Sequence, residues 1–223
     1  MIRKLLLTLA FGLASFGAIA SPAAPKAGAE FEVLPAPLAT NAAPGKVEVI
    51  EFFSYGCPHC RAFEPALAAW VKKNADKITF RRVHIAYRPV EQPLQRLYTT
   101  LEAMGMTEAV HSKIFAAVQD DHERLVSEAA VIAWVPKVGI DPAQFAATWR
   151  SFGMPSRISA AQASVTGFNV DLWPSIGIDG RFYTSPSKVA EAAGKEVQTV
   201  EQQHQAGLKV MDFLVAKAKA EKK

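Results

Sequence analysis

The sequence predicts an α/β fold in which a split β-α-β / β-β-α core is interrupted by a block of helices. Three observations favour this layout. Strand patterns rich in β-branched and aromatic residues lie in both halves of the chain, helical periodicity fills the region between them, and a hairpin signal precedes the final helix. The 223 residues are 50% hydrophobic and 21% charged, as in soluble globular proteins that bury a large core.

The first residues have the features of a secretory signal peptide. Two cations, Arg3 and Lys4, precede an apolar run from Leu5 to Ile19, and small residues follow it. An uncleaved membrane anchor is the alternative, but the run contains glycine and is shorter than the roughly 20 apolar residues that cross a bilayer. We therefore expect residues 1–20 to be removed near Ala20-Ser21, which would place the cysteines in an oxidising compartment.

The formal net charge of +4 does not indicate a nucleic-acid-binding surface. Arg3 and Lys4 leave with the signal peptide and the terminal KAKAEKK carries a net three positive charges, so the folded body is close to −1. The tail is expected to be a solvated helix end, where cations favour the negative end of the helix dipole. We expect no nucleic-acid partner and a monomeric protein.

Two strand patterns and a helix between them predict the first part of the core. Residues 21–45 are rich in alanine and proline and are expected to be an extended leader, with a short edge strand at Phe31–Leu34. The run VEVIEFF, Val47–Phe53, alternates with a period of two, and ITFRRVHIAY, Ile78–Tyr87, is expected to be a second strand. The helical stretch between them favours parallel pairing through a right-handed crossover.

The middle of the chain, from Pro89 to about Ala163, has helical periodicity in LQRLYTTLEAM and EAVHSKIFAAV and helix-start signals at Asp141-Pro142 and Pro155. The segment SIGIDGRFYT then carries Asp179-Gly180, a two-residue hairpin signal. A long final helix is expected after it. Its expected buried stripe is Val197, Val200, Leu208, Met211 and Leu214 or Val215, and the expected core tryptophans are Trp70, Trp134 and Trp149.

Both cysteines of the chain lie in SYGCPHC, Ser54–Cys60, where the first strand runs into a helix expected to begin at Pro58. Cys57 would then face unpaired backbone N–H groups and the positive end of the helix dipole, both of which stabilise a thiolate. His59 would add to this effect if it is protonated or donates a hydrogen bond. Cys60, one turn later, is expected to face inward within disulfide reach.

Three kinds of site are compatible with two cysteines at this spacing. A structural disulfide would close a tiny loop and restrain the unfolded chain little. A metal site needs three or four ligands, and nothing in the spacing suggests that His59, His84 or His111 supplies them. Redox exchange needs one exposed, activated thiol and one shielded thiol. We therefore favour redox exchange, with a non-enzymatic copper- or zinc-handling protein as an alternative.

The segment EFFSYGCPHC, the helical insertion and Pro174 before the hairpin together resemble the DsbA-type thiol:disulfide oxidoreductases of the thioredoxin superfamily. Pro65 also matches the kink proline that is common in the active-site helix of thioredoxins. The resemblance covers nearly all of the mature chain and implies a thioredoxin-like fold with an inserted all-helical domain. The thioredoxin-like domain would comprise residues 46–89 and 164–223, and the insertion residues 90–163.

The resemblance also implies a periplasmic function. Such a protein donates its Cys57–Cys60 disulfide to newly exported proteins with free thiols, through a mixed disulfide on Cys57, and needs no other cofactor. A DsbB-like, quinone-linked membrane protein would re-oxidise it. A disulfide isomerase or reductase on the same fold remains an alternative, although isomerases of this compartment usually carry a dimerisation domain and the leader is too short for one.

Glu51 lies on the strand that leads to Cys57, and its carboxylate is expected to be buried beneath the active site. One interpretation is a structural ion pair with Arg81 or Arg82. The resemblance implies instead a proton relay for the buried Cys60, and burial would raise the pKa of Glu51 toward that task.

Two motifs complete the expected site. Pro58 and His59 separate the cysteines, and the resemblance implies a functional role for the histidine. Pro174 is expected to be cis and to lie against the disulfide, with the preceding residue pairing with substrate backbone. That residue is Trp173, where the family commonly has threonine or valine, and we expect its ring to widen the apolar landing surface beside Cys57. The remaining histidines are expected to be ordinary strand or helix residues.

Overall fold

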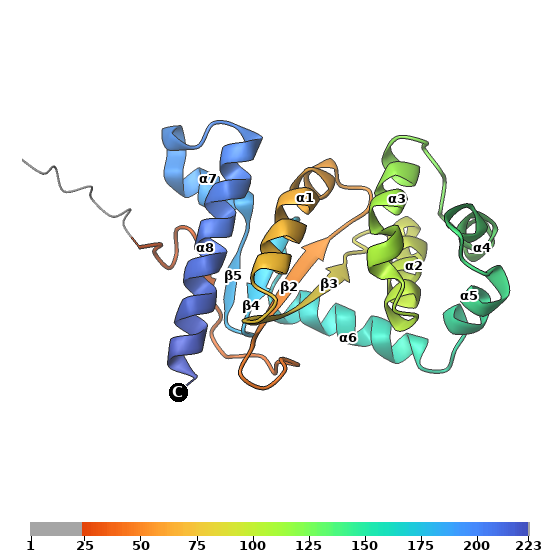
Figure 1. Ribbon diagram of the computed structural model, residues 1–223, viewed down its shortest axis with the longest axis horizontal. Helices are drawn as coiled ribbons and strands as arrows, with labels where there is room; N and C mark the ends of the chain where they lie inside the picture. Colours follow the sequence, from red (N-terminus) through yellow and green to blue (C-terminus); the bar gives the residue numbers. More distant parts are fainter. Residues whose placement is uncertain (1–23, 223) are drawn as a thin grey trace, which may run out of the picture.

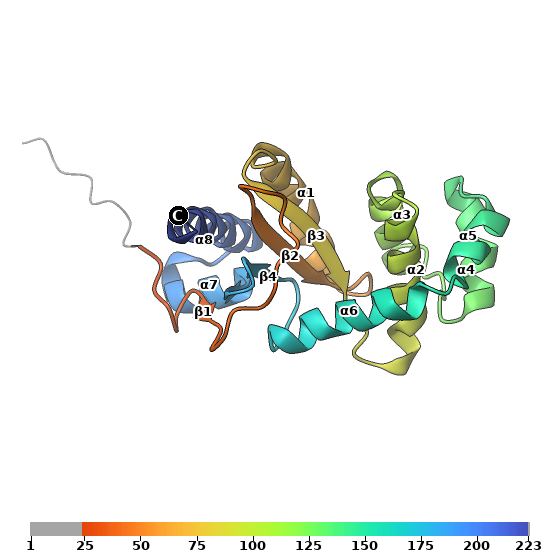
Figure 2. The same ribbon diagram turned by 90° about the horizontal axis from the view of Figure 1, so that it is seen from below.

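The computed structural model describes residues 24–222, so the predicted signal peptide lies outside the described residues. Five strands form one mixed sheet in the order β1-β5-β4-β2-β3. Helices cover both faces of the sheet, and a group of helices stands beside it (Figures 1 and 2). This is the split core with a helical block that the sequence predicts. Within the described range, no helix is both long and apolar enough to span a bilayer.

Strand β2 (Val47–Phe53) and the edge strand β3 (Ile78–His84) are parallel and joined through the crossover helix α1 (Pro58–Lys73), as predicted. The expected second strand was too long, because it ends at His84 and not at Tyr87. The Ile85 N–H still donates to the Phe53 carbonyl at 2.7 Å, but β2 ends there and offers no further partner.

The second half of the sheet is the predicted hairpin of β4 (Ser175–Ile178) and β5 (Phe182–Thr184). The turn residues Asp179 and Gly180 both have positive φ, at 55° and 64°, as the two-residue signal requires. The ladder resumes only at Phe182, however, which leaves Arg181 outside the pairing. The short strand β1 (Glu32–Val33) pairs with β5 at the edge, which confirms the predicted edge strand.

Two layers of helices bury the sheet. On one face, α1 and the C-terminal helix pack on Val47 and Val49. On the other face, the helix that returns from the insertion packs on Ile50 and Phe52, through residues such as Val165 (Figure 2). Both faces of β2 are therefore buried along its whole length, which holds the turn after Phe53 in a fixed place.

The helical insertion contains five helices, and its core, which includes Trp134 and Trp149, is continuous with Phe53, Tyr55 and Cys60 beside the sheet. The five helices are α2 (Gln92–Ala103), α3 (Thr107–Gln119), α4 (Glu128–Trp134), α5 (Pro142–Trp149) and α6 (Met154–Gly167). The last of them continues to Gly167, past residue 163 where we placed the end of the insertion, because it runs back onto the sheet.

The predicted long final helix is present as α8 (Val200–Glu221). A short helix that was not predicted, α7 (Pro186–Ala193), precedes it, and a break at Gly194, where φ is 59°, separates the two. Val200, expected to be buried, is 48% exposed because it is the first residue of α8, before that helix reaches the core. Val197, also expected on the stripe, lies before α8 and is half-buried, whereas the expected positions on α8 from Leu208 to Val215 are buried.

Candidate active site

Cys57 is the N-cap residue of α1, and Pro58 occupies the first position of that helix, as predicted. The Cys57 side chain is partly exposed, whereas Cys60 is wholly buried, and both are free thiols. The backbone N–H of Cys60 donates to Cys57 Sγ at 3.4 Å. Pro58 and His59 are exposed between them. The two thiols therefore differ in access: only Cys57 faces solvent.

The two thiols also differ in acidity. The hydrogen bond from the Cys60 side chain lowers the pKa of Cys57 from 9.0 to about 6, although burial opposes this. The backbone N–H groups of Cys60 and His59 and the charge of His59 act in the same direction as the thiol hydrogen bond. Burial raises the pKa of Cys60 far above its usual range. At neutral pH the pair consists of one ionised, accessible sulfur and one protonated, shielded sulfur.

The peptide bond between Trp173 and Pro174 is cis, as predicted. Cys57 Sγ lies 3.6 Å from the carbonyl oxygen of Trp173, so this loop borders the reactive sulfur. The Trp173 ring packs against Tyr87, with 6.2 Å between ring centroids, and Tyr87 is 79% exposed. Sequence analysis missed Tyr87 at the site because it assigned this residue to the end of a strand.

Helix α3 and strand β3 hold the turn before Cys57 through buried side chains. The Gln119 amide donates to the carbonyls of Tyr55, at 2.8 Å, and of Cys57, at 3.1 Å. The Tyr55 hydroxyl lies 2.9 Å from His111 Nδ1, and its backbone N–H donates to His84 Nε2 at 3.1 Å. These two histidines were expected to be ordinary strand or helix residues, yet both support the active-site turn.

Glu51 lies beneath the site in a cluster of charges, in which Arg82 and Glu51 are buried and Glu108 reaches the surface. Arg82 Nε donates to one carboxylate oxygen of Glu51 at 2.9 Å, and the other oxygen has no hydrogen-bond partner among the described residues. The same guanidinium donates to Glu64 and to Glu108, each at 2.6 Å. One cation is thus shared among three carboxylates, so burial outweighs its effect and raises the pKa of Glu51 to about 8.

Within residues 24–222, no three His, Cys, Asp or Glu side chains come together in an arrangement that could hold a metal ion.

The chain matches the Thioredoxin family model over residues 40–194. The thiol:disulfide interchange protein DsbA of Burkholderia cepacia is 35% identical over 223 residues, which cover 99% of this chain and 100% of that relative. The protein of the same name from Pseudomonas aeruginosa strain PAO1 is 30% identical over 98% of both chains. A crystal structure of Pseudomonas aeruginosa DsbA has a TM-score of 0.78 at 27% identity and covers 89% of this chain and 96% of that one.

These similarities extend over both the sheet and the helical insertion, so they do not rest on the short cysteine motif alone. Together with the strand-turn-helix geometry around Cys57, they establish a thioredoxin fold that carries a helical insertion. The chain therefore belongs to the DsbA-type thiol:disulfide oxidoreductases of the thioredoxin superfamily.

Proposed function

We propose that this protein acts in the periplasm as a dithiol oxidase that donates a Cys57–Cys60 disulfide to newly exported proteins. The observation that carries the proposal is the asymmetry of the two sulfurs. Cys57 is accessible and has a pKa lowered to about 6, whereas Cys60 is buried with a raised pKa. The disulfide itself would be the redox centre, with no further cofactor.

In the oxidised protein, a substrate thiolate attacks Cys57 Sγ, forms a mixed disulfide and displaces Cys60, which takes up a proton. A second substrate thiolate then attacks its neighbour's sulfur in the mixed disulfide, and Cys57 leaves as a thiolate. Two electrons pass from the substrate dithiol to the protein. Because a sulfur of low pKa is the better leaving group, the second step favours release of oxidised substrate. A DsbB-like membrane protein would accept the electrons and restore the disulfide.

The first prediction concerns the redox potential and its pH dependence. Equilibration with glutathione buffers, with the thiols counted by alkylation and mass spectrometry, should give a potential far above the roughly −270 mV of thioredoxin. Between pH 6 and 8 reduction should take up one proton, so the potential should fall by about 30 mV per pH unit. Below the Cys57 pKa of about 6, it should change by about 59 mV per unit.

The direction of this pH dependence follows from the lowered pKa of Cys57. The thiolate favours the folded, reduced form above pH 6, and this preference is lost as the pH falls through 6. A thioredoxin-like potential would instead support the reductase alternative, and a single slope across pH 6 would contradict the ionised thiol.

The second prediction concerns Glu51, which we propose as the proton relay for Cys60. Its unpartnered oxygen and its pKa of about 8 suit a group that gains and loses a proton near neutral pH. Glu51→Gln should fold normally, yet its rate of thiol-disulfide exchange should lose the inflection near pH 8. Stopped-flow tryptophan fluorescence from pH 5 to 9 measures that rate.

Glu48→Gln is the matched control, because Glu48 lies on the same strand, is equally buried at 1% exposure and pairs with Arg81 at 3.2 Å. It should keep the inflection near pH 8. The relay is contradicted if the rate profiles of both variants match that of the unaltered protein.

The third prediction concerns Trp173, whose ring we propose as part of the surface on which substrates land. Trp173→Val should weaken binding of a short apolar peptide about two- to tenfold, since an aromatic contact contributes about 0.5–1.5 kcal/mol beyond the area it buries. Phe152→Val is the control, because Phe152 is a fully exposed aromatic residue in the insertion. Equal affinity in the two variants, measured by calorimetry, would remove Trp173 from the binding surface.

A further inference from the structure

Strand β3 forms one edge of the sheet, and part of its backbone points away from the sheet. The Val47 N–H donates to the Lys77 carbonyl, and the Ile85 N–H donates to the Phe53 carbonyl, so residues 77 and 85 both face β2. Successive residues of a strand direct their N–H and C=O groups to opposite sides. The residues whose backbone groups face outward are Ile78, whose N–H donates to the Asn74 carbonyl, and Phe80, Arg82 and His84.

The outward groups of β3 are only partly satisfied. The His84 carbonyl accepts a hydrogen bond from the Gln95 side chain at 2.9 Å. Within residues 24–222, no strand pairs with this side of β3 and no side chain bonds to the N–H or C=O of Arg82, a residue that is 4% exposed overall. A buried polar group without a partner costs about 1–3 kcal/mol. These groups therefore favour a molecule that can both donate and accept hydrogen bonds along the strand edge.

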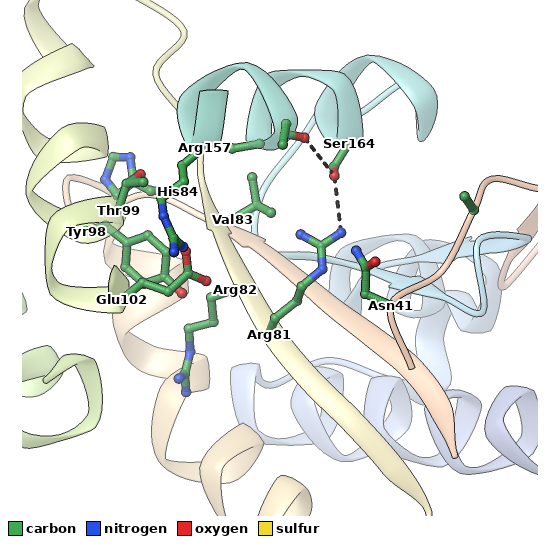
Figure 3. Close-up of a pocket in the computed structure, with 13 residues that line it drawn as sticks. Asn41, Arg81, Arg82, Val83, His84, Tyr98, Thr99, Glu102, Arg157 and Ser164 are labelled. Carbon is green, nitrogen blue, oxygen red and sulfur yellow. Dashed lines mark hydrogen bonds between the residues drawn. The ribbon is translucent and has the colours of Figure 1, made fainter. Parts of the chain in front are cut away.

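A cavity of about 480 Å³ lies against this edge, between β3, α2 and α6 (Figure 3). Arg81 and Val83 point into it toward α6, whereas the side chain of Arg82 points away toward the other face of the sheet (Figure 3). The strand therefore presents its backbone to the cavity at Arg82. The volume lies within the range of about 300–1,000 Å³ that is usual for binding pockets.

The walls of the cavity carry charges of both signs. Glu102 comes from α2 and Arg157 from α6, and neither forms a salt bridge with a residue that the structure describes, although the charges of Arg81 and Arg157 partly oppose the burial that raises the pKa of Glu102. Arg81 already has hydrogen-bond partners, because it donates to Glu48 and to Ser164, each at 3.2 Å. A simple anion would pair only with Arg157, and a simple cation only with Glu102. A polypeptide offers backbone donors and acceptors together with side chains of either charge.

We propose that this cavity binds an extended segment of an unfolded polypeptide, which adds to β3 as a further strand. An acidic residue of that segment would pair with Arg157 and a basic one with Glu102. The strand edge itself determines the peptide character of the occupant, whereas its identity as an unfolded exported protein rests on the proposed function. The edge also reaches the active site, because His84 at its end accepts a hydrogen bond from the Tyr55 N–H. A segment held here would keep the rest of the substrate near Cys57.

The test uses the mature full-length protein and a peptide without cysteine. The probe is an acetylated, amidated eight-residue peptide of alternating threonine and valine that carries one glutamate and one lysine. Its control is the same peptide with N-methyl groups on alternate amides, which keeps the charges but removes the backbone donors. In backbone NMR spectra, the first peptide should shift the amides of Phe80, Arg82 and His84, and the N-methylated peptide should not.

A substitution that fills the cavity shows whether the peptide binds there and not elsewhere. Ala160 is exposed and lines the cavity on α6, so Ala160→Tyr should occupy the space without disturbing the core. Gln162→Tyr is the control, since two residues further along a helix lie about 200° around its axis. Ala160→Tyr should weaken peptide binding at least tenfold, and Gln162→Tyr should leave it unchanged. Shifts confined to Cys57 and Trp173, or equal binding of both peptides, would overturn the proposal, as would the same amide shifts with inorganic phosphate alone.

The outcome is separable from that of the proposed function. Ala160→Tyr should oxidise a four-residue dithiol peptide at the rate of the unaltered protein, because such a peptide reaches only the active site. Slow oxidation by the unaltered protein would count against the dithiol oxidase and leave the peptide-binding result intact.

Discussion

Replacing Cys57 with serine should abolish thiol-disulfide exchange, whereas the Cys60→Ser variant should still form a mixed disulfide that it cannot resolve. Only Cys57 meets solvent, because Cys60 is 0% exposed. With a pKa of about 6, about nine-tenths of Cys57 is ionised at pH 7, against about one hundredth for a thiol of pKa 9.0. Incubation with oxidised glutathione should therefore add one glutathione to Cys60→Ser and none to Cys57→Ser, as read by intact-protein mass spectrometry.

The lowered pKa of Cys57 has a different effect on the step in which this sulfur attacks and on the step in which it leaves. The gain in thiolate fraction is about ninetyfold, but intrinsic nucleophilicity falls about 15- to 30-fold over the same three pKa units. Attack by Cys57 is therefore accelerated only a few-fold. The main gain is in the step where Cys57 is the leaving group, and that is the step that releases oxidised substrate.

A second pair of variants tests the cause of the lowered pKa. The Cys60 side chain makes the largest contribution, and serine keeps a hydrogen-bond donor where alanine does not. The rate of alkylation of Cys57 with iodoacetamide should therefore show its inflection at a higher pH in Cys60→Ala than in Cys60→Ser.

The glutathione experiment also tests which cysteine is the nucleophile. Adduct formation at Cys60 in the Cys57→Ser variant, at a rate like that of Cys57, would contradict the assignment of the nucleophile.

The parts of the site that are local in sequence could be predicted, and the parts that depend on packing could not. The strand before Ser54, the proline at the first position of α1 and the thiol at its N-cap follow from short-range rules on dihedral angles and capping. The sharing of Arg82 by three carboxylates depends on the positions of α1 and α3, which no local pattern determines. Gln119 and His111 reach the active-site turn only because the insertion folds back on it.

The short helix α7 had a signal in the sequence that was not used. It ends at Gly194 in EAAGKEV, and a glycine with positive φ is the usual way to end a helix. Tyr87 had no such signal, because its exposure depends on where β2 ends.

Arg82→Met should destabilise the protein by about 3–5 kcal/mol, the usual cost of removing one partner from a buried ion pair. The Arg82 side chain is 3% exposed, and its neighbours Glu51 and Glu64 are 1% and 15% exposed, so the variant leaves buried carboxylates without a cation. Urea unfolding followed by circular dichroism gives the free energy. Arg61→Met is the control, because Arg61 pairs with Asp120 at the surface and should leave the free energy nearly unchanged.

The pH dependence and a double variant identify the carboxylate responsible for that loss. Since the folded pKa of Glu51 is raised to about 8, its contribution to stability is complete below pH 4.5 and is lost as the pH rises through 8. Without Arg82 the pKa should rise further, because the cation that lowers it is gone. The loss of unfolding free energy in Arg82→Met should therefore be larger at pH 8 than at pH 5.

Adding Glu51→Leu to Arg82→Met should recover part of the lost unfolding free energy, since an apolar pair can replace a buried ion pair at little cost. An equal penalty at both pH values, with no recovery in the double variant, would show that Arg82 stabilises the fold through its packing on Phe80 and not through its charge.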